Sequence, residues 1–486
     1  MYEKMSVSAL SRMIRGREAK PSEICAGFLA RAGKLGPEIN AFINIDGDAV
    51  MRRAKELDGR LDKPGGAGGG IPALFGIPVA LKDNICTLDL PTTCGSKMLE
   101  NFRSPYEATI ISRLRDCGAV ILGKTNMDEF AMGSSTETSF FGAVRNPHDL
   151  TRTPGGTSGG SAAAVASGMA PCSLGSDTGG SIRQPAAFCG LVGYKPTYGA
   201  VSRYGLIPYA GSFDQAGPIT RTVADAALLA AAIAGYDPMD ATSEPGYAPD
   251  FSDIIEDRAF SLKGRKIGIL KECFADGLSD EIRAAVMSAA ETYKKLGAEI
   301  VDISIPAIEH SLPVYYIIAL AEASSSLARF DGVKFGYRSA DCNDSDSLYI
   351  NSRTECFGAE VKKRIILGTY ILTADNYEAY YKKARIVQVM LREQFKSAFE
   401  TCDAILSPVT PGAAPKIGEK EKNPAKLYLN DICTVPANIA GLPAVSVPFG
   451  KDGGGLPIGV QLMGRRFDDA RLLAFARALE RETEVF

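Results

Sequence analysis

The sequence contains only two histidines, His148 and His310. A serine hydrolase of the Ser-His-Asp type uses a histidine to take the proton of its nucleophile. His148 lies in an Asn-Pro-His-Asp turn, and His310 follows Glu309 in a stretch without a catalytic motif. Neither histidine suits the role of base, so a serine nucleophile in this chain would need another group to activate it.

The chain also lacks a basic surplus, long apolar runs and clustered cysteines. Its net charge of −3 argues against broad electrostatic binding to nucleic acid by this chain alone. No run of about twenty apolar residues, as a membrane-spanning helix needs, occurs, and residues 1–17 lack the apolar core of a signal peptide. The eleven cysteines are scattered singly, without the spacing of zinc ligands. We therefore expect a cytoplasmic protein with free thiols and no structural metal.

The pattern along the chain favours an α/β fold. Continuous apolar stretches alternate with helical patterns, which is typical of a sheet buried between helices. Strands are predicted near residues 77–81, 119–122, 265–270, 299–305, 404–408, 444–449 and 458–463, and helices over 5–35, 47–62, 108–116, 161–168, 222–235, 279–296 and 468–482. We predict a single large domain over residues 1–486, with a mixed, mostly parallel central sheet covered by helices on both faces. Residues 1–62 are interpreted as an N-terminal helical segment, and residues 237–262 as a surface excursion.

Residues 154–185 contain two glycine pairs, and each pair precedes a hydroxyl residue. Gly155 and Gly156 precede Thr157, while Gly179 and Gly180 precede Ser181. Clustered glycine is costly unless the backbone needs a positive φ or must approach a ligand closely. The N–H groups around the second pair could form an oxyanion hole beside the Ser181 hydroxyl. The alternatives are an ordinary turn or a phosphate-binding loop.

A lysine, Lys82, directly follows the apolar residues 77–81. Burial at the end of a strand would lower the pKa of its amine until the neutral form could act as a base. This interpretation fits the scarcity of histidine. The alternative is an exposed lysine at a strand end.

Residues 118–125 match the P-loop pattern of nucleotide-binding proteins. In a true P-loop the middle residues wrap a phosphate after a strand has ended. Here residues 119–122 are themselves apolar and are predicted to be the strand. We therefore do not expect Lys124 to bind a nucleotide.

These stretches resemble the amidase signature family. The similar stretches are residues 82–84, 123–133, 155–161, 175–185, 190–199 and 213–218. The resemblance thus extends well beyond the glycine pairs, and it implies the amidase signature fold.

In that family a lysine, a serine in a cis peptide and a second serine hydrolyse amides. The resemblance implies that Lys82 is the base, Thr157 the proton relay and Ser181 the nucleophile. The oxyanion is expected to bind the N–H groups of Thr178, Gly179 and Gly180. Thr157 stands where the family usually has serine; it keeps the hydroxyl, but its methyl group restricts the side chain. Ser158 is the alternative relay.

Residues 315–332 and 357–370 are similar to one branch of the family, the A subunits of aspartyl/glutamyl-tRNA amidotransferases. In that branch free glutamine is the amide donor. The resemblance implies that Arg364 pairs with the α-carboxylate, that Asp431 holds the α-ammonium and that Tyr315 donates a hydrogen bond nearby. Without the resemblance, Arg364 and Asp431 would be interpreted as ordinary surface charges.

The resemblance also implies partner subunits, with no cofactor in this chain. Ammonia would pass to a B subunit, which uses ATP and Mg²⁺ to convert Glu-tRNA(Gln) or Asp-tRNA(Asn) to Gln-tRNA(Gln) or Asn-tRNA(Asn). A small C subunit would brace the pair, and the misacylated tRNA would be held mainly by the partner. The alternatives are a stand-alone amidase that uses the same three residues, and a catalytically silent scaffold or nucleotide-binding subunit. The presence of Lys82 and Ser181 disfavours the silent subunit.

Overall fold

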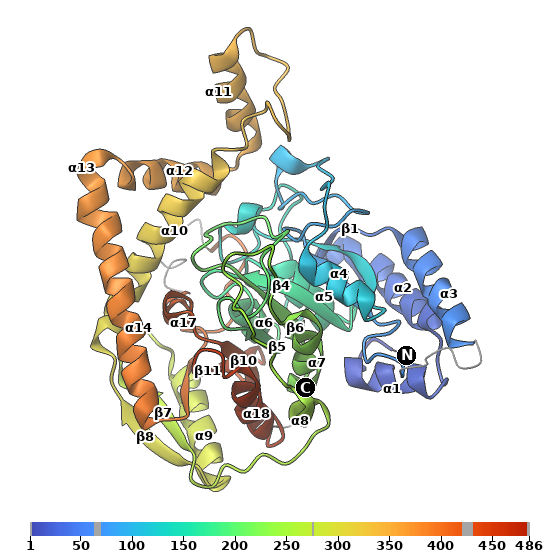
Figure 1. Ribbon diagram of the computed structural model, residues 1–486, viewed down its shortest axis with the longest axis vertical. Helices are drawn as coiled ribbons and strands as arrows, with labels where there is room; N and C mark the ends of the chain where they lie inside the picture. The colour runs from blue at the N-terminus through green and yellow to red at the C-terminus, as the bar shows by residue number, and fades with distance from the viewer. Residues whose placement is uncertain (1, 63–69, 275–276, 420–430, 484–486) are drawn as a thin grey trace.

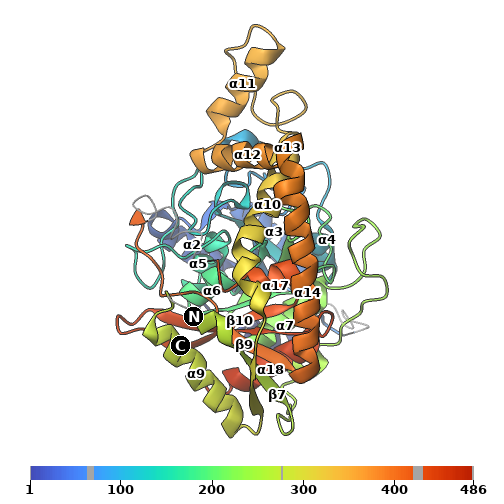
Figure 2. The same ribbon diagram turned by 90° about the vertical axis from the view of Figure 1, so that its left-hand side faces the viewer.

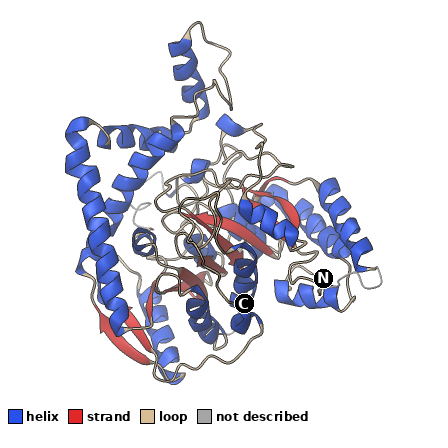
Figure 3. Ribbon diagram, in the orientation of Figure 1, coloured by secondary structure: helices blue, strands red, loops and turns tan. Residues whose placement is uncertain are grey.

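A mixed sheet of eleven strands runs through the molecule (Figures 1 and 3). The computed structural model describes residues 2–62, 70–274, 277–419 and 431–483. The strand order is β1-β3-β2-β4-β6-β5-β10-β11-β9-β7-β8. The strands are β1 (Phe42–Asn44), β2 (Pro78–Lys82), β3 (Val120–Thr125), β4 (Cys172–Asp177), β5 (Val192–Lys195), β6 (Gln215–Thr220), β7 (Lys266–Leu270), β8 (Glu299–Ile303), β9 (Ala404–Pro408), β10 (Ala444–Lys451) and β11 (Pro457–Met463).

Helices flank this sheet, as predicted (Figure 3). They are α1 (Val7–Arg15), α2 (Pro21–Ile39), α3 (Gly47–Leu61), α4 (Thr109–Asp116), α5 (Gly159–Ala166), α6 (Arg183–Phe188), α7 (Val223–Ile233), α8 (Ser252–Ile255), α9 (Asp280–Lys295), α10 (Ser311–Leu327), α11 (Ser345–Cys356), α12 (Ala359–Ile371), α13 (Ala374–Asn376), α14 (Lys383–Thr401), α17 (Val435–Ala440) and α18 (Asp469–Glu480). Short 3₁₀ turns are η1 (Lys97–Leu99), η2 (Glu129–Ala131), η3 (Lys271–Phe274) and η4 (Pro306–His310), and η5 (Tyr377–Lys382) is a π-helical turn. None of the described helices is both long and apolar enough to cross a membrane.

The predicted sheet is mixed, but its parallel part is smaller than we expected. Of the ten strand pairings among the described residues, four are parallel and six antiparallel. Helical crossovers connect parallel strands at the two ends of the sheet, in β3-β2-β4 and β9-β7-β8. The middle strands β6, β5, β10 and β11 alternate in direction, and the short turn between β10 and β11 can only join antiparallel strands.

Local sequence explains several of the helices that flank the sheet. The side chain of Thr222 accepts a hydrogen bond from the Asp225 N–H and so caps α7, and Ser279 caps α9 in the same way. Helix α5 consists of small residues because it packs against backbone: a Cβ atom on Gly160 would lie 2.6 Å from the carbonyl oxygen of Ala41. This close packing places the residues before α5 beside β2 and β4.

The N-terminal residues contain the predicted helices α1, α2 and α3, but also β1, which the sequence did not reveal. Strand β1 is only three residues long and forms the edge of the sheet, where it pairs with β3. Residues 237–262 contain the single short helix α8 and are mostly exposed. On the opposite side of the molecule from α1–α3, helices α10, α12 and α14 lie together, and α11 projects beyond them (Figures 1 and 2).

Candidate active site

The site lies at the carboxyl ends of the parallel strands β2 and β4. Lys82 is the last residue of β2, and its side chain is fully buried. Its Nζ donates hydrogen bonds to Thr157 Oγ1 (2.6 Å) and to the carbonyl oxygen of Ser176 (3.1 Å). Burial lowers the pKa of Lys82 to about 7, although nearby carboxylates, Asp128 first among them, act in the opposite direction. Near neutral pH a large fraction of this amine is therefore uncharged.

Thr157 follows a cis peptide bond from Gly156 and points its hydroxyl at Lys82. The turn before it is closely packed, since the N–H of Gly156 donates to Gln184 Oε1 at 2.9 Å. Ser158, the alternative relay, behaves differently. Its hydroxyl donates to the carbonyl oxygen of Ser176 (3.1 Å) and accepts from the Ser176 N–H (3.3 Å). Thr157 is thus the hydroxyl residue of this loop that contacts the lysine.

Ser181 lies in the loop between β4 and α6 and is 9 % exposed. Its carbonyl oxygen accepts a hydrogen bond of 3.1 Å from the Ser158 N–H, which joins the two glycine loops. Its Oγ makes no hydrogen bond to any described residue, so the contact between Thr157 and Ser181 is not closed. Catalytic hydrogen bonds are often loose before substrate binds and tighten in the reacting complex.

The backbone donors beside Ser181 differ from the prediction at Gly180. Its N–H donates to Asp177 Oδ1 at 2.8 Å, so its single hydrogen is already used. The N–H groups of Thr178, Gly179 and Ser181 donate to no acceptor in the described part of the chain. These three are the donors available to an oxyanion.

A buried ion pair holds this loop in shape. Asp177 accepts hydrogen bonds from Arg183 Nε (3.1 Å) and Nη2 (3.0 Å) and from Asn438 Nδ2 (2.8 Å). Burial alone would raise the pKa of Asp177, but Arg183 holds it well below its ordinary value. On the other side, Thr434 Oγ1 donates to the carbonyl oxygen of Gly179 at 2.6 Å. A side chain on Gly180, whose φ is +135°, would also collide with Thr434.

The predicted substrate-binding residues converge on the same loop through two adjacent tyrosines of α10. Tyr315 packs against the loop of residues 178–181, since a Cβ atom on Gly179 would lie 2.7 Å from its hydroxyl oxygen. Tyr316 contacts both Asp431 and Arg364. Its hydroxyl donates to Asp431 Oδ2 (3.2 Å), and the guanidinium of Arg364 lies over its ring, 5.7 Å from the centroid. The expected hydrogen bond near Asp431 thus comes from Tyr316, while the Tyr315 hydroxyl has no partner among the described residues.

Arg364 is a buried cation, not the surface charge that a helix position alone would suggest. It is 2 % exposed; its Nε donates to Glu360 Oε1 (2.9 Å) and its Nη1 to the Tyr209 hydroxyl (2.8 Å). Its Nη2 donates to no described acceptor. Asp431 is also buried, and burial raises its pKa to about 7 against the effect of Arg364. A buried cation, Arg364, thus contacts the ring of Tyr316, and a buried acid, Asp431, contacts its hydroxyl.

The P-loop-like residues form strand β3 (Val120–Thr125), as predicted. Lys124 is buried in β3 and donates to the carbonyl oxygen of Ile85 (2.5 Å) and to Thr92 Oγ1 (2.9 Å), and it forms an ion pair with Asp83 (3.3 Å). Among the described residues no group of His, Cys, Asp and Glu side chains is arranged to hold a metal ion.

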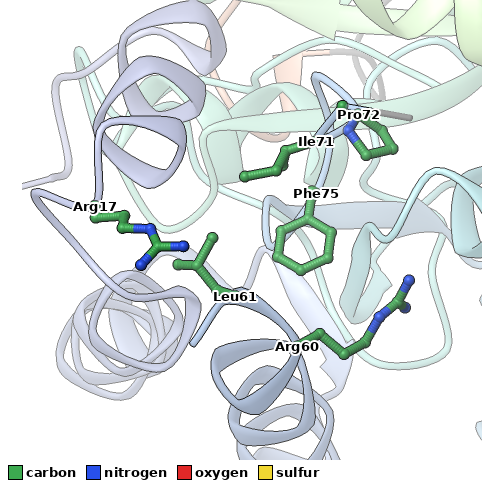
Figure 4. Close-up of a pocket in the computed structure, with 7 residues that line it drawn as sticks. Arg17, Arg60, Leu61, Ile71, Pro72 and Phe75 are labelled. Carbon is green, nitrogen blue, oxygen red and sulfur yellow. The ribbon is translucent and has the colours of Figure 1, made fainter. Parts of the chain in front are cut away.

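The cavities that lie outside this constellation include two of different size. One of about 680 Å³ is lined in part by Asp214, whose carboxylate accepts a hydrogen bond of 2.6 Å from Thr178 Oγ1. The other, of about 200 Å³, lies between the end of α3 and residues 70–75. Arg17 lies beside Leu61 there (Figure 4), and the guanidinium of Arg60 lies 5.6 Å from the ring centroid of Phe75. This cavity contains none of the predicted site residues.

Several residues that shape the site were not predicted from the sequence. They are Tyr209, Tyr316, Glu360, Thr434 and the pair of Asp177 with Arg183. Glu360 could have been found, because it precedes Arg364 by four residues on one helix face. Tyr209 and Thr434 had no such signal, because their partners are far away in the sequence.

Comparisons with known proteins agree on the family. The amidase family model matches residues 23–473. The A subunit of glutamyl-tRNA(Gln) amidotransferase from Microcystis aeruginosa is 51% identical over 482 residues, which cover 99% of this chain and 98% of that protein. The protein of the same name from Persephonella marina is 50% identical and is matched over 97% of this chain and 96% of its own length.

Solved structures show the same fold. The crystal structure of the A subunit of glutamyl-tRNA(Gln) amidotransferase from Thermotoga maritima has a TM-score of 0.81 and 40% sequence identity, and the match covers 100% of this chain and 96% of that one. The peptide amidase from Stenotrophomonas maltophilia has a TM-score of 0.84 at 30% identity, over 100% of this chain and 98% of that one.

Proposed function

Because the chain belongs to the amidase family, we propose that it is the glutamine-hydrolysing A subunit of a tRNA-dependent amidotransferase. The observation that carries this proposal is the pairing of a buried, low-pKa lysine with the Thr157 hydroxyl, next to a loop with free N–H groups. The relatives that are about half identical over nearly the whole chain bear the name of such a subunit.

The first step is acylation of Ser181. Its Oγ attacks the side-chain carbonyl carbon of glutamine, and its proton passes to Thr157 while the Thr157 proton passes to the neutral amine of Lys82. The N–H groups of Thr178, Gly179 and Ser181 stabilise the negative charge on the oxygen. Protonated Lys82 then returns a proton by the same route to the leaving nitrogen. The C–N bond breaks, and ammonia leaves.

The second step frees the enzyme. Water attacks the glutamyl ester, again with Lys82 as the base, and glutamate leaves as the Ser181 hydroxyl reforms. During both steps Arg364 binds the α-carboxylate through its free Nη2, and ionised Asp431 binds the α-ammonium. Tyr316 holds these two groups at a fixed separation, since it contacts both.

The ammonia serves a partner. We propose that a B subunit uses ATP and Mg²⁺ to activate Glu-tRNA(Gln) or Asp-tRNA(Asn) and forms the amide with this ammonia, and that a small C subunit completes a heterotrimer. The net charge of −3 fits a chain that leaves the tRNA mainly to its partner.

Arg364 provides the test of substrate choice. Arg364→Ala should raise the KM for glutamine by about 100-fold, because the α-carboxylate loses a buried, charge-assisted partner. Acylation of Ser181 by a small probe without a carboxylate should stay within about twofold of the original rate, because the probe does not use Arg364. Ammonia release at varied glutamine concentration gives the KM.

Lys363→Ala is the matched control, because Lys363 is the neighbouring residue and also pairs with Glu360 (2.8 Å). It should leave the KM for glutamine nearly unchanged. If the original protein preferred a simple alkyl amide to glutamine, and Arg364→Ala did not change the KM, the stand-alone amidase would be the correct function.

A further inference from the structure

A buried carboxylate connects the core of the protein to the helix that carries Arg364. Glu129, in the turn η2, is 3 % exposed. Its Oε2 accepts a hydrogen bond of 2.8 Å from the N–H of Gly358, and its Oε1 accepts one of 2.5 Å from the hydroxyl of Ser96. Gly358 is the N-cap residue of α12. Glu129 therefore binds the start of the helix on which Arg364 lies.

The chemistry at this contact suits a fixed attachment. The first N–H groups of a helix have no partner within the helix, and the helix dipole favours a negative charge at this end. Gly358 has an ordinary φ of −67°, so its backbone does not require glycine. A Cβ atom there would lie 2.5 Å from Glu129 Oε2, which explains the absence of a side chain.

The turn around Glu129 is itself held firmly. Phe130 and Ala131 have positive φ values of 49° and 58°, which side chains rarely adopt unless the surroundings fix them. The ring of Phe130 packs on Phe330 (4.9 Å between centroids) and on Phe357 (5.7 Å), the residue before Gly358. The same turn thus contacts the chain before α12 through both a carboxylate and an aromatic ring.

Asp128, the residue before Glu129, connects the turn η2 to the loop that contains Thr157. Asp128 Oδ2 accepts a hydrogen bond of 2.8 Å from the Thr136 N–H, and the Thr136 hydroxyl donates to the carbonyl oxygen of Gly155 at 2.7 Å. Gly155 lies two residues before Thr157. Asp128 and Glu129 therefore join the loop of the proton relay to the helix of Arg364.

We propose that Glu129 is a positioning residue that fixes α12 and thereby sets the affinity of Arg364 for the α-carboxylate of the substrate. The proposal rests on the proposed function. Arg364 lies six residues after Gly358, or about 9 Å along a rigid helix. A shift at the start of α12 therefore moves the guanidinium relative to Ser181, and the binding of an α-carboxylate tolerates such a shift poorly because a charge-assisted hydrogen bond from Nη2 is directional.

The test compares kinetics of full-length variants. Glu129→Gln keeps the size of the side chain but removes its charge, and it should raise the KM for glutamine about tenfold, with kcat within about twofold. Acylation of Ser181 by a small sulfonyl fluoride should keep its rate, because this probe does not use Arg364. Ser96→Ala, a milder change, should raise the KM in the same direction. The assays should be run well above pH 7, where Glu129 is ionised, because burial raises the pKa of Glu129 to about 7.

Asp225→Asn is the matched control. Asp225 is another buried carboxylate that binds the start of a helix, through the N–H groups of Val7 (3.0 Å) and Ser8 (2.9 Å) of α1. Asp225→Asn should lose about as much thermal stability as Glu129→Gln, but its KM for glutamine should be unchanged. An equal rise in KM in Asp225→Asn would overturn the proposal, because general loosening would then explain the effect.

Hydrogen–deuterium exchange separates this proposal from the proposed function. In Glu129→Gln the amides of residues 358–364 should exchange faster than in the original protein, while those of α1 should not. Unchanged exchange together with an unchanged KM would overturn the role of Glu129. If Glu129→Gln exchanges faster but the original protein does not hydrolyse glutamine, the attachment of α12 by Glu129 is supported and the glutaminase function is rejected.

Discussion

Replacing Lys82 with methionine should lower the rate of Ser181 acylation by roughly 10³- to 10⁴-fold, the upper part of the usual contribution of a positioned general base. Methionine has a similar length and tolerates burial, but it cannot accept a proton. The Thr157 hydroxyl, whose hydrogen bond to Lys82 Nζ measures 2.6 Å, would then have no base. Stopped-flow acylation with a small sulfonyl fluoride measures this step without substrate binding or ammonia release.

A second buried lysine provides the control. Lys195 is fully buried, and burial lowers its pKa to about 7 as well, but its amine donates to the carbonyl oxygens of Pro196 (2.8 Å) and Leu442 (2.5 Å). Lys195→Met should destabilise the protein, while the fraction that folds should acylate at a rate within about tenfold of the original. A comparable loss in both variants would mean that burial of an amine, and not base catalysis, accounts for the effect at Lys82.

Replacing Thr157 with valine should lower the acylation rate by roughly 10²- to 10³-fold, because the relay oxygen is lost. Valine and threonine have nearly the same shape, so the packing of the loop is preserved. Thr157→Ser should keep the activity, since serine supplies the same hydroxyl without the methyl group that restricts it. The same stopped-flow measurement applies.

Ser158→Ala is the control for this loop. The Ser158 hydroxyl bonds to Ser176 and not to the lysine, so its removal should affect stability more than acylation. If Ser158→Ala acylated slowly while Thr157→Val kept the original acylation rate, the proton relay would pass through Ser158.

The strands and helices that the sequence predicted best are those with a strong local signal. Strand β2 is a continuous apolar run, and α9 has a serine cap and a helical pattern. Four strands, β1, β4, β5 and β6, were not predicted: β1 has only three residues, and the other three contain glycine among few apolar residues, which interrupts the pattern of a strand. The sheet is mixed, as predicted, but the expectation that most of it is parallel was wrong, because strand direction depends on connections and pairings across the sheet, which local patterns do not record.

In the candidate site, too, residues with a local sequence signal were predicted, and contacts between residues far apart in the sequence were not. Lys82 was recognised as a base candidate from its position after an apolar run and from the scarcity of histidine. Its contact with Thr157, 75 residues away in the sequence, was implied only by resemblance. Tyr209 lies 155 residues from Arg364, so no local pattern could connect them. Gly180 was assigned a free N–H because the sequence does not reveal that Asp177 occupies it.

The neutral state of Lys82 is the claim on which the chemistry depends. With glutamine as the substrate, the pKa of about 7 of Asp431 also affects the pH profile, because this acid must be ionised to hold the α-ammonium. Both groups become active as pH rises, so glutamine kinetics cannot separate them. A neutral acylating probe that does not use Asp431 reports on the lysine alone.

The most direct measurement is therefore the pH dependence of Ser181 acylation by a neutral sulfonyl fluoride. Below its pKa Lys82 is protonated and cannot accept a proton, so the rate should rise with pH, with a midpoint of about 7, and become constant above it. The Lys82→Met variant should lack this midpoint. A rate that keeps rising toward the ordinary lysine pKa of 10.5, or the same midpoint in Lys82→Met, would contradict the assignment of Lys82 as the base.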